Sequence, residues 1–264
     1  MSDLKGFSLP RTPLGRCSLA PNPPWYYVAN ALAIEYRVEA QAAASFLPPG
    51  LKLRSDSAAV YFADWQSVTE HGEENLDPVR SQYRETIFLL SAELDGEAVA
   101  FCPFIWVDQD VSLMRGLVAG WPKQIGSVWI TRSYELPSKA SPNVGEGGNF
   151  GATLAVKDRR FATARVKLRE KTSELPTPDF ARAVNVRYFP DLSKGNHGNP
   201  LVHDLVQLKS RDVQIGEIWK GDADLEMLDD PSFEVSALRP LEVIAGYRFS
   251  FAFTVDDILV LKRY

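Results

Sequence analysis

The segment from Tyr83 to Val107 limits the possible folds of this chain more than any other. It consists of two apolar, β-branched runs that flank Asp95-Gly96. This dipeptide suits a type I′ turn, so the segment predicts a β-hairpin. Two further runs, Gly151–Lys157 and Phe161–Arg169, predict a second hairpin across Asp158-Arg159.

Most of the remaining regular structure is also predicted to be strand. The other strand-like runs are Leu32–Arg37, Ala58–Val68, Val128–Leu136, Val184–Phe189, Val202–Trp219 and Leu241–Val255. In the last run, Tyr247, Phe249, Phe251 and Phe253 alternate with Arg248, Ser250 and Ala252, which is typical of a half-buried strand. Only short helices are expected, at Val38–Phe46 and Val111–Ala119. Many strands joined by short loops favour a mostly β fold, an antiparallel closed or nearly closed β-barrel.

Composition narrows the class of protein. With 264 residues, 45% of them hydrophobic and 24% charged, the chain is expected to form one globular domain over 1–264, in which the Pro- and Gly-rich residues 1–25 form an extended arm. The net charge of −5 argues against nonspecific nucleic-acid binding. Two cysteines provide no disulfide framework, and no apolar run indicates a signal peptide or a membrane span. We therefore expect a cytoplasmic protein without nucleic-acid or membrane partners.

Common catalytic patterns are missing. The three histidines have no matching ligand set, so no metal is expected. Phe150 occupies the last glycine position of a GxGxxG that would start at Gly145, so the dinucleotide fingerprint fails. No Gly-x-Ser-x-Gly elbow occurs either.

Lys123 lies between a Trp-Pro and an Ile-Gly pair, in the stretch Gly120-Trp-Pro-Lys-Gln-Ile-Gly126. A lysine surrounded by apolar groups loses hydration, which favours its neutral, nucleophilic amine. The alternative is a turn lysine that reaches solvent over Trp121. Glu85 presents a similar choice, because it is either an ordinary carboxylate at a strand end or, inside a barrel mouth, a proton shuttle.

These motifs together resemble the acetoacetate decarboxylase-like superfamily. Trp121-Pro122-Lys123 followed by Ile125-Gly126 resembles its Schiff-base lysine motif, and Tyr83-Arg84-Glu85 resembles its Tyr-x-Glu. Three other segments match in the same order: Tyr36-Arg37, Leu47-Pro48-Pro49-Gly50-Leu51 and Pro240-Leu241-Glu242-Val243-Ile244. The resemblance covers residues 25–262 and implies a cone-shaped β-barrel, a Schiff base on Lys123 and a homo-oligomer. An exposed Trp25-Tyr26-Tyr27 would suit a subunit interface, although burial within one subunit is equally compatible.

Three departures from the decarboxylases point to different chemistry. Gln124 stands where those enzymes carry a second lysine, Ala29 falls where they place a pocket arginine, and Arg115-Gly116-Leu117 does not reproduce their Gly-Arg-Glu. Some members of the superfamily are aldolase-dehydratases, which form an imine with pyruvate and condense the resulting enamine with an aldehyde. A protonated imine is the electron sink in both reactions, so no metal or organic cofactor is implied.

The resemblance therefore predicts a Schiff-base lyase acting on short keto acids. The leading expectation is a pyruvate aldolase-dehydratase with a keto acid and an aldehyde as partners. Decarboxylation of a β-keto acid and a noncatalytic ligand-binding barrel are the alternatives. We expect Lys123 as nucleophile, Glu85 as proton shuttle or orienter, and Tyr247 or Tyr83 as donor to the departing hydroxyl. Gln124, Tyr83 and Trp121 are the expected substrate-binding residues. An ordinary buried aromatic is the alternative for Tyr247.

Overall fold

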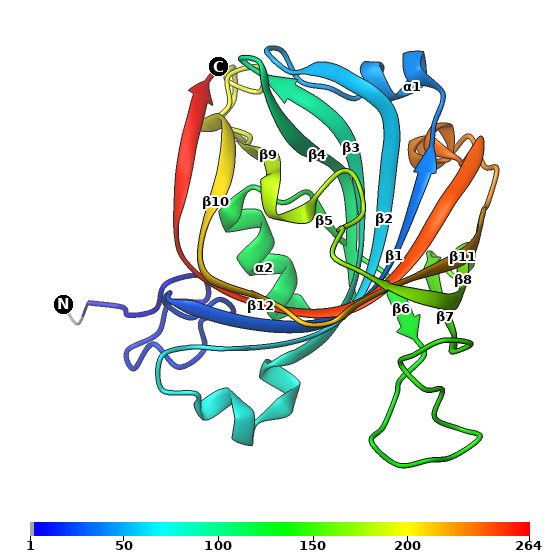
Figure 1. Ribbon diagram of the computed structural model, residues 1–264. Coiled ribbons are helices and arrows are strands. Elements are labelled where there is room, and N and C mark those ends of the chain that lie inside the picture. The colour runs from blue at the N-terminus through cyan, green and yellow to red at the C-terminus, as the bar shows by residue number, and fades with distance from the viewer. Residues whose placement is uncertain (1–2) are drawn as a thin grey trace.

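A single twelve-stranded sheet forms most of the protein in the computed structural model, which describes residues 3–264 (Figure 1). The strands are β1 (Trp25–Arg37), β2 (Lys52–Val68), β3 (Gln82–Leu94), β4 (Glu97–Val107), β5 (Lys123–Ile125), β6 (Ser127–Ile130), β7 (Asn149–Val156), β8 (Arg159–Thr172), β9 (Ala183–Phe189), β10 (Val202–Ile215), β11 (Ile218–Met227) and β12 (Glu242–Arg263). The helices are α1 (Ala40–Ser45) and α2 (Asp110–Ala119), with 3₁₀ turns at Glu73–Leu76, Pro78–Arg80, Phe180–Arg182 and Glu234–Leu238.

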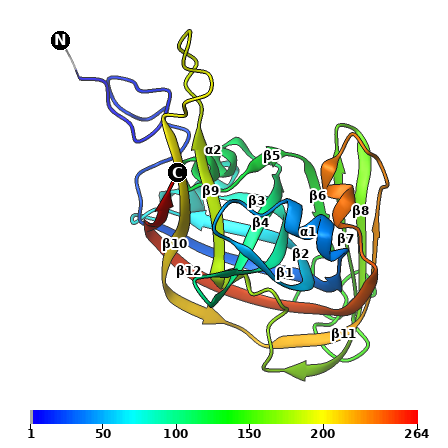
Figure 2. The ribbon, with the colours of Figure 1, turned by 90° about the horizontal axis from the view of Figure 1, so that it is seen from above.

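Seven strands form a closed circuit of pairings, which we call the ring. The order is β1-β2-β3-β4-β9-β10-β12, and β12 pairs again with β1. In Figure 1 these strands curve around α2, which lies inside the ring. From β12 the sheet continues through β11, β8, β7 and β6, which lie beside the ring when seen from above (Figure 2). The predicted mostly β, antiparallel architecture is confirmed, apart from two short parallel pairings of β4, with β5 and with β9.

The two predicted hairpins are present, and their turns follow from backbone conformation. Asp95 and Gly96 both have positive φ, 50° and 88°, as a type I′ turn requires. In the second hairpin the positive φ values are at Lys157 and Asp158, so the turn lies one residue earlier than predicted. The predicted strand 128–136 ends at Ile130. The predicted strand 202–219 is two strands, β10 and β11, which separate at Gly216.

Strand β12 is buried on both faces from Ala245 to Phe249, where a half-buried strand was predicted. Tyr247 and Phe249 are 2% and 4% exposed, but Arg248 between them is also only 4% exposed. Its Nη1 donates to the carbonyl oxygens of Ala31 and Phe249, at 3.2 and 3.1 Å. Burial lowers the pKa of Arg248 to about 10. Phe150 of β7 lies against Arg248, with 5.4 Å between its ring centre and the guanidinium carbon, so both faces of β12 are covered in this segment.

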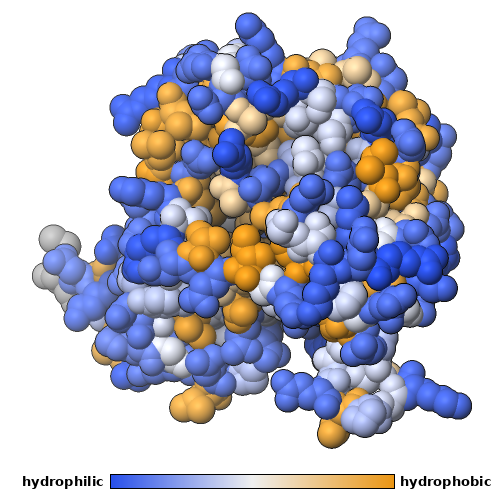
Figure 3. Space-filling view, in the orientation of Figure 1, coloured by the Kyte–Doolittle hydropathy of each residue, from blue (hydrophilic) through white to orange (hydrophobic). Residues whose placement is uncertain are grey.

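The surface is mostly hydrophilic, with hydrophobic side chains gathered near the middle of the face in Figure 3. Within residues 3–264, no helix is both long and apolar enough to cross a membrane.

Candidate active site

Helix α2 and strand β5 bring Lys123 into the interior of the ring. The helix ends at Ala119, and the φ of the following Gly120, 91°, lies in the left-handed region that glycine adopts most easily. The chain then reverses, and Lys123 pairs with Ile105 of β4. This turn lays the Lys123 side chain over Gly116. A Cβ at position 116 would lie 2.3 Å from Lys123 Cδ, so only glycine leaves room for the lysine in this position.

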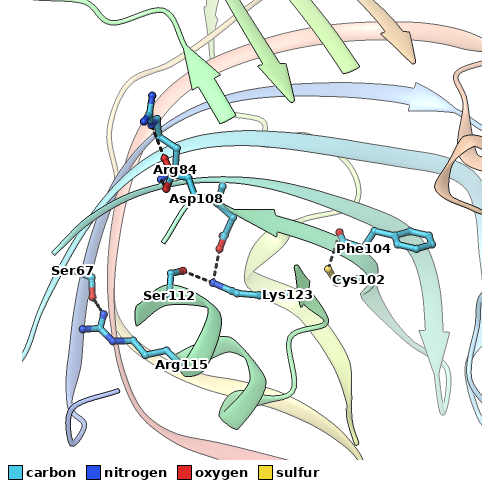
Figure 4. Close-up of polar contacts among 9 residues, drawn as sticks. Ser67, Arg84, Cys102, Phe104, Asp108, Ser112, Arg115 and Lys123 are labelled. Carbon is cyan, nitrogen blue, oxygen red and sulfur yellow. Dashed lines mark hydrogen bonds and ion pairs between the residues drawn. The ribbon is translucent and has the colours of Figure 1, made fainter. Parts of the chain in front are cut away.

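The amine of Lys123 is held by a carboxylate and a hydroxyl (Figure 4). Its Nζ donates to Glu85 Oε2 at 2.5 Å and to Ser112 Oγ at 2.9 Å. The side chains of Lys123 and Glu85 are only 8% and 4% exposed. Burial raises the pKa of Glu85 above its ordinary value, and the neighbouring Lys123 ammonium opposes that rise. The short Nζ–Oε2 contact gives the ammonium proton a direct path to the carboxylate.

Aromatic rings form the walls around this amine. Lys123 Nζ lies 5.3 Å from the centre of the Tyr83 ring, and Tyr83 stacks on Trp65 at 6.0 Å. Burial raises the pKa of Tyr83 well above that of a free phenol, so its hydroxyl is protonated and acts as a hydrogen-bond donor. Trp121 lines the same cavity and is 6% exposed. The structure thus brings together four of the predicted residues: Lys123, Glu85, Tyr83 and Trp121.

Arg115 on α2 adds a cation to the site, although in the sequence it stands out only as a mismatch to the Gly-Arg-Glu of the decarboxylases. It lines the Lys123 cavity and is 4% exposed. Its Nη1 donates to Ser67 Oγ, whereas Nε and Nη2 have no hydrogen-bond partner among residues 3–264. An unsatisfied buried guanidinium is costly, and its fork geometry matches a carboxylate. The cavity that contains the Lys123 amine is therefore also lined by a cation that can bind an anion, although Ala29 places no charge at the expected arginine position.

Gln124 and Tyr247 do not line the Lys123 cavity. On β5, consecutive side chains point to opposite sides, so Gln124 is exposed while Lys123 points inward. The Tyr247 hydroxyl donates to Glu35 Oε2 at 3.1 Å, and burial raises its pKa. The alternation of side chains along β5 explains why Gln124 is exposed. The hydrogen bond to Glu35 explains where the Tyr247 hydroxyl points. The structure thus gives no geometric support for their predicted roles.

The N-terminal aromatic residues belong partly to this cavity. Trp25 and Tyr27 both line it, and Trp25 is 5% exposed. Phe7 of the predicted arm packs edge-on against Trp25, with ring centres 6.0 Å apart. Burial within the subunit therefore accounts for Trp25 and Tyr27 without a partner. Residues 1–2 of the predicted arm lie outside the described residues.

A second cavity adjoins the first. Trp121, Phe180, Leu208 and Phe253 line both. The remaining lining of the second cavity is mainly aromatic and aliphatic: Tyr61, Leu175, Asp179, Ala181, Ala183, Ser210, Val213, Ile215, Phe249 and Phe251. Among residues 3–264, no group of three or more His, Cys, Asp or Glu side chains could hold a metal ion.

The fold and the lysine cavity agree with the comparisons to known proteins. The family model described as acetoacetate decarboxylase (ADC) matches residues 8–264. The chain therefore belongs to the acetoacetate decarboxylase family. A search of curated proteins found no match.

Solved structures give more detail. The enduracididine biosynthesis enzyme MppR, complexed with the condensation product of pyruvate and imidazole 4-carboxaldehyde, is 35% identical, with a TM-score of 0.92 over 100% of this chain and 99% of MppR. An acetoacetate decarboxylase-like enzyme from Sphingomonas wittichii RW1 is 23% identical, with a TM-score of 0.90 over 98% and 100% of the two chains. Acetoacetate decarboxylase from Legionella pneumophila is 17% identical, with a TM-score of 0.76 over 100% and 98%. The last two show a shared fold alone.

Proposed function

We propose that this protein is a lyase that joins pyruvate to an aldehyde through an imine on Lys123 and then eliminates water. One observation carries the proposal: a buried Lys123–Glu85 pair shares its cavity with the unpartnered edge of Arg115. The cavity thus contains a nucleophile, a proton acceptor and an anion site. These are the groups that a lysine-dependent reaction of a short keto acid needs.

Binding comes first. The pyruvate carboxylate accepts hydrogen bonds from Nε and Nη2 of Arg115, the two nitrogens without another partner. This orients the C2 carbonyl toward Lys123, since both side chains line one cavity. Arg115 therefore replaces, from α2, the arginine that the chain lacks at Ala29.

Imine formation follows. Glu85 accepts the ammonium proton across the 2.5 Å contact, and the neutral amine attacks C2 of pyruvate. The carbonyl oxygen takes up protons and leaves as water, which gives the protonated imine. Burial supports this role of Glu85, because its raised pKa makes the carboxylate a better proton acceptor than an exposed glutamate.

Carbon–carbon bond formation uses the same groups again. Glu85, ionised once more, removes a methyl proton from the imine, and the electron pair moves into the enamine. The enamine carbon attacks the aldehyde carbon, and the aldehyde oxygen is protonated to a hydroxyl. Loss of this hydroxyl with a proton from the adjacent carbon releases water and leaves a conjugated imine. Hydrolysis then frees an unsaturated 2-oxo acid and restores Lys123.

The hydroxyl needs a proton donor as it leaves. Tyr83 lines the Lys123 cavity and carries a phenolic proton that can be passed to the departing hydroxyl. Ser112 Oγ, 2.9 Å from the amine, can pass a proton between Lys123 and the substrate oxygen. Of the two tyrosines expected for this role, Tyr83 has the supporting geometry.

Two observations favour condensation over decarboxylation. MppR, which is 35% identical, has been solved with pyruvate and with a pyruvate–aldehyde condensation product. In addition, the apolar cavity next to the lysine provides room for a second substrate. Decarboxylation needs only one small keto acid.

Borohydride trapping tests the proposal. Pyruvate and borohydride should give a covalent adduct by intact mass in the wild type and in Lys171→Ala, but none in Lys123→Ala. Adding an aldehyde without borohydride should produce a new conjugated absorbance, again dependent on Lys123. Release of carbon dioxide from acetoacetate without condensation would instead support the decarboxylase alternative. No adduct with any keto acid or ketone would indicate a noncatalytic binding protein.

A further inference from the structure

We propose that the second cavity is the acceptor subsite and that it selects aldehydes with an uncharged aromatic or apolar substituent. This inference rests on the proposed condensation and adds the class of its second substrate. It depends on the position, lining and fixed shape of that cavity.

The second cavity lies where the aldehyde substituent would extend. With the pyruvate carboxylate on Arg115 and C2 on Lys123, the reacting methyl carbon lies at the other end of the substrate. The aldehyde substituent becomes attached beyond that carbon, so it extends away from Arg115. The two cavities meet at Trp121 and Phe180, whose rings stack with centres 5.5 Å apart and planes 18° apart. The substituent can therefore enter the second cavity along this shared wall.

The lining determines which substituent is favoured. Phe249 and Phe251 face the cavity together with Tyr61, and aliphatic groups such as Ile215 complete it. Planar groups gain area burial and ring–ring contacts in such surroundings. Asp179 is the one charged residue in the described lining, and its Oδ1 accepts from the backbone N–H of Ala181 at 2.9 Å. No lysine or arginine is among the described residues that line this cavity, so the negative charge of Asp179 disfavours anionic aldehydes.

The wall formed by Phe180 is held in place. Its loop joins β8 to β9, and three hydrogen bonds fasten that loop to β1 and β2. Tyr61 Oη donates to the Pro178 carbonyl at 3.3 Å, the Thr177 N–H donates to Glu35 Oε2 at 3.3 Å, and Ser57 Oγ donates to the Thr177 carbonyl at 3.0 Å. Glu35 is itself bonded by Tyr247. A preformed cavity costs less ordering on binding than one that must assemble.

Competition between aldehydes tests the subsite in the wild-type protein. With pyruvate fixed, kcat/KM should be at least about tenfold higher for benzaldehyde than for acetaldehyde, and glyoxylate should be the poorest of the three, because apolar burial of this size is worth that discrimination. The conjugated absorbance of each product reports the rate.

Two substitutions should narrow the second cavity at residues that do not line the Lys123 cavity. Ile215→Trp enlarges a side chain at its rim, and Ala183→Leu enlarges a buried one, 5% exposed. Each should lower the benzaldehyde to acetaldehyde ratio of kcat/KM by about tenfold. Ile244→Trp is the matched control, since Ile244 and Ile215 are 44% and 45% exposed and Ile244 lines neither cavity. This control should leave the ratio unchanged.

The outcomes separate the two proposals. A pyruvate adduct on Lys123 with no preference for benzaldehyde, or an unchanged ratio in both cavity variants, would overturn the subsite and leave the condensation intact. Preference for glyoxylate would likewise overturn it. Absence of any pyruvate adduct would overturn the condensation and the subsite together.

Discussion

Two lysine–glutamate pairs in this protein have nearly the same geometry and very different surroundings. Lys123–Glu85 and Lys171–Glu217 each have an N–O distance of 2.5 Å. Each ammonium also lies near an aromatic ring, 5.3 Å from that of Tyr83 and 5.4 Å from that of Trp219. The side chains of the first pair are 8% and 4% exposed, and those of the second 56% and 67%.

Burial alone reverses the direction in which the pKa of the glutamate carboxyl group shifts. The bond from Lys171 lowers the pKa of Glu217, whereas burial raises the pKa of Glu85 despite a lysine at the same distance. In water the ion pair simply favours both charges. Inside the ring, loss of hydration disfavours them, so a proton can pass between the partners. Reactivity thus depends on what encloses the pair, not on the pair itself.

Glu85→Gln and Glu217→Gln should differ more in their effect on kcat than any other pair of substitutions considered below. Glutamine keeps the shape of the side chain but cannot accept a proton from Lys123 or from the imine methyl group. We expect kcat for condensation to fall by about 10²- to 10⁴-fold. Glu217→Gln should leave kcat unchanged. Equal effects of the two substitutions would remove the special role of the buried pair.

The pH dependence of the two carboxyls should have opposite signs. The raised folded pKa of Glu85 means that its contribution to stability is present below the unfolded value and is lost as pH rises through the folded value. The lowered pKa of Glu217 gives a contribution present above the unfolded value and lost as pH falls through the folded value. Subtracting the unfolding profile of each Gln variant from that of the wild type isolates each carboxyl.

The pH dependence of activity should also reflect the raised pKa of Glu85. Because Glu85 must be ionised to accept a proton, the acidic limb of kcat should have its midpoint above 4.5, the ordinary glutamate value. A limb at or below that value, or one that persists in Glu85→Gln, would assign it to another group.

Gly116→Ala should displace the buried lysine without unfolding the helix. Alanine is the better helix former, but its Cβ would overlap Lys123 Cδ, 2.3 Å away. We expect pyruvate trapping to slow by about tenfold, because small misplacements of a reacting group are costly. Gly198→Ala is the control, since a Cβ there meets nothing within 4 Å. Normal trapping by Gly116→Ala would show that the lysine position is not critical.

Lys171→Ala should have the smallest effect. Exposed pairs contribute little and are screened by salt. The midpoint of denaturation should stay within experimental error of the wild type, and trapping on Lys123 should be normal. A large loss of stability at high salt would contradict this account of the exposed pair.

Local sequence signals predicted the fold best where burial and turn chemistry agree. The Asp95-Gly96 hairpin was predictable because its flanking strands are apolar and both turn residues tolerate positive φ. Strand β11 was mostly missed, although Ala223, Leu225 and Met227 alternate in it with Asp222, Asp224 and Glu226. These carboxylates pair with Arg169 and Arg165 of the neighbouring β8. The apolar residues between them belong to the core or pack against it, and Leu225 is 4% exposed, so the period of a half-buried strand was present in the sequence and was overlooked.

The candidate site was predictable only where a family motif carried it. Lys123, Glu85, Tyr83 and Trp121 meet in one cavity, as the motifs indicated. Ser112 and Arg115 were missed, although polar residues on the buried face of α2 were a usable signal. Phe180 gave no such signal, because it lies in the short 3₁₀ turn between β8 and β9, whose place beside Trp121 depends on distant strands.

The pairing of β1 with β12 also has a consequence for how the protein acquires its fold. Ser250 and Asn30, joined by a side-chain hydrogen bond across this pairing, are 220 positions apart along the chain. Contacts between such distant segments carry a large entropy of loop closure and are typical of slow folding. Phe253 and Val255 of β12 also line the Lys123 cavity. During refolding from denaturant, trapping of Lys123 by pyruvate should therefore recover late, together with this closing step.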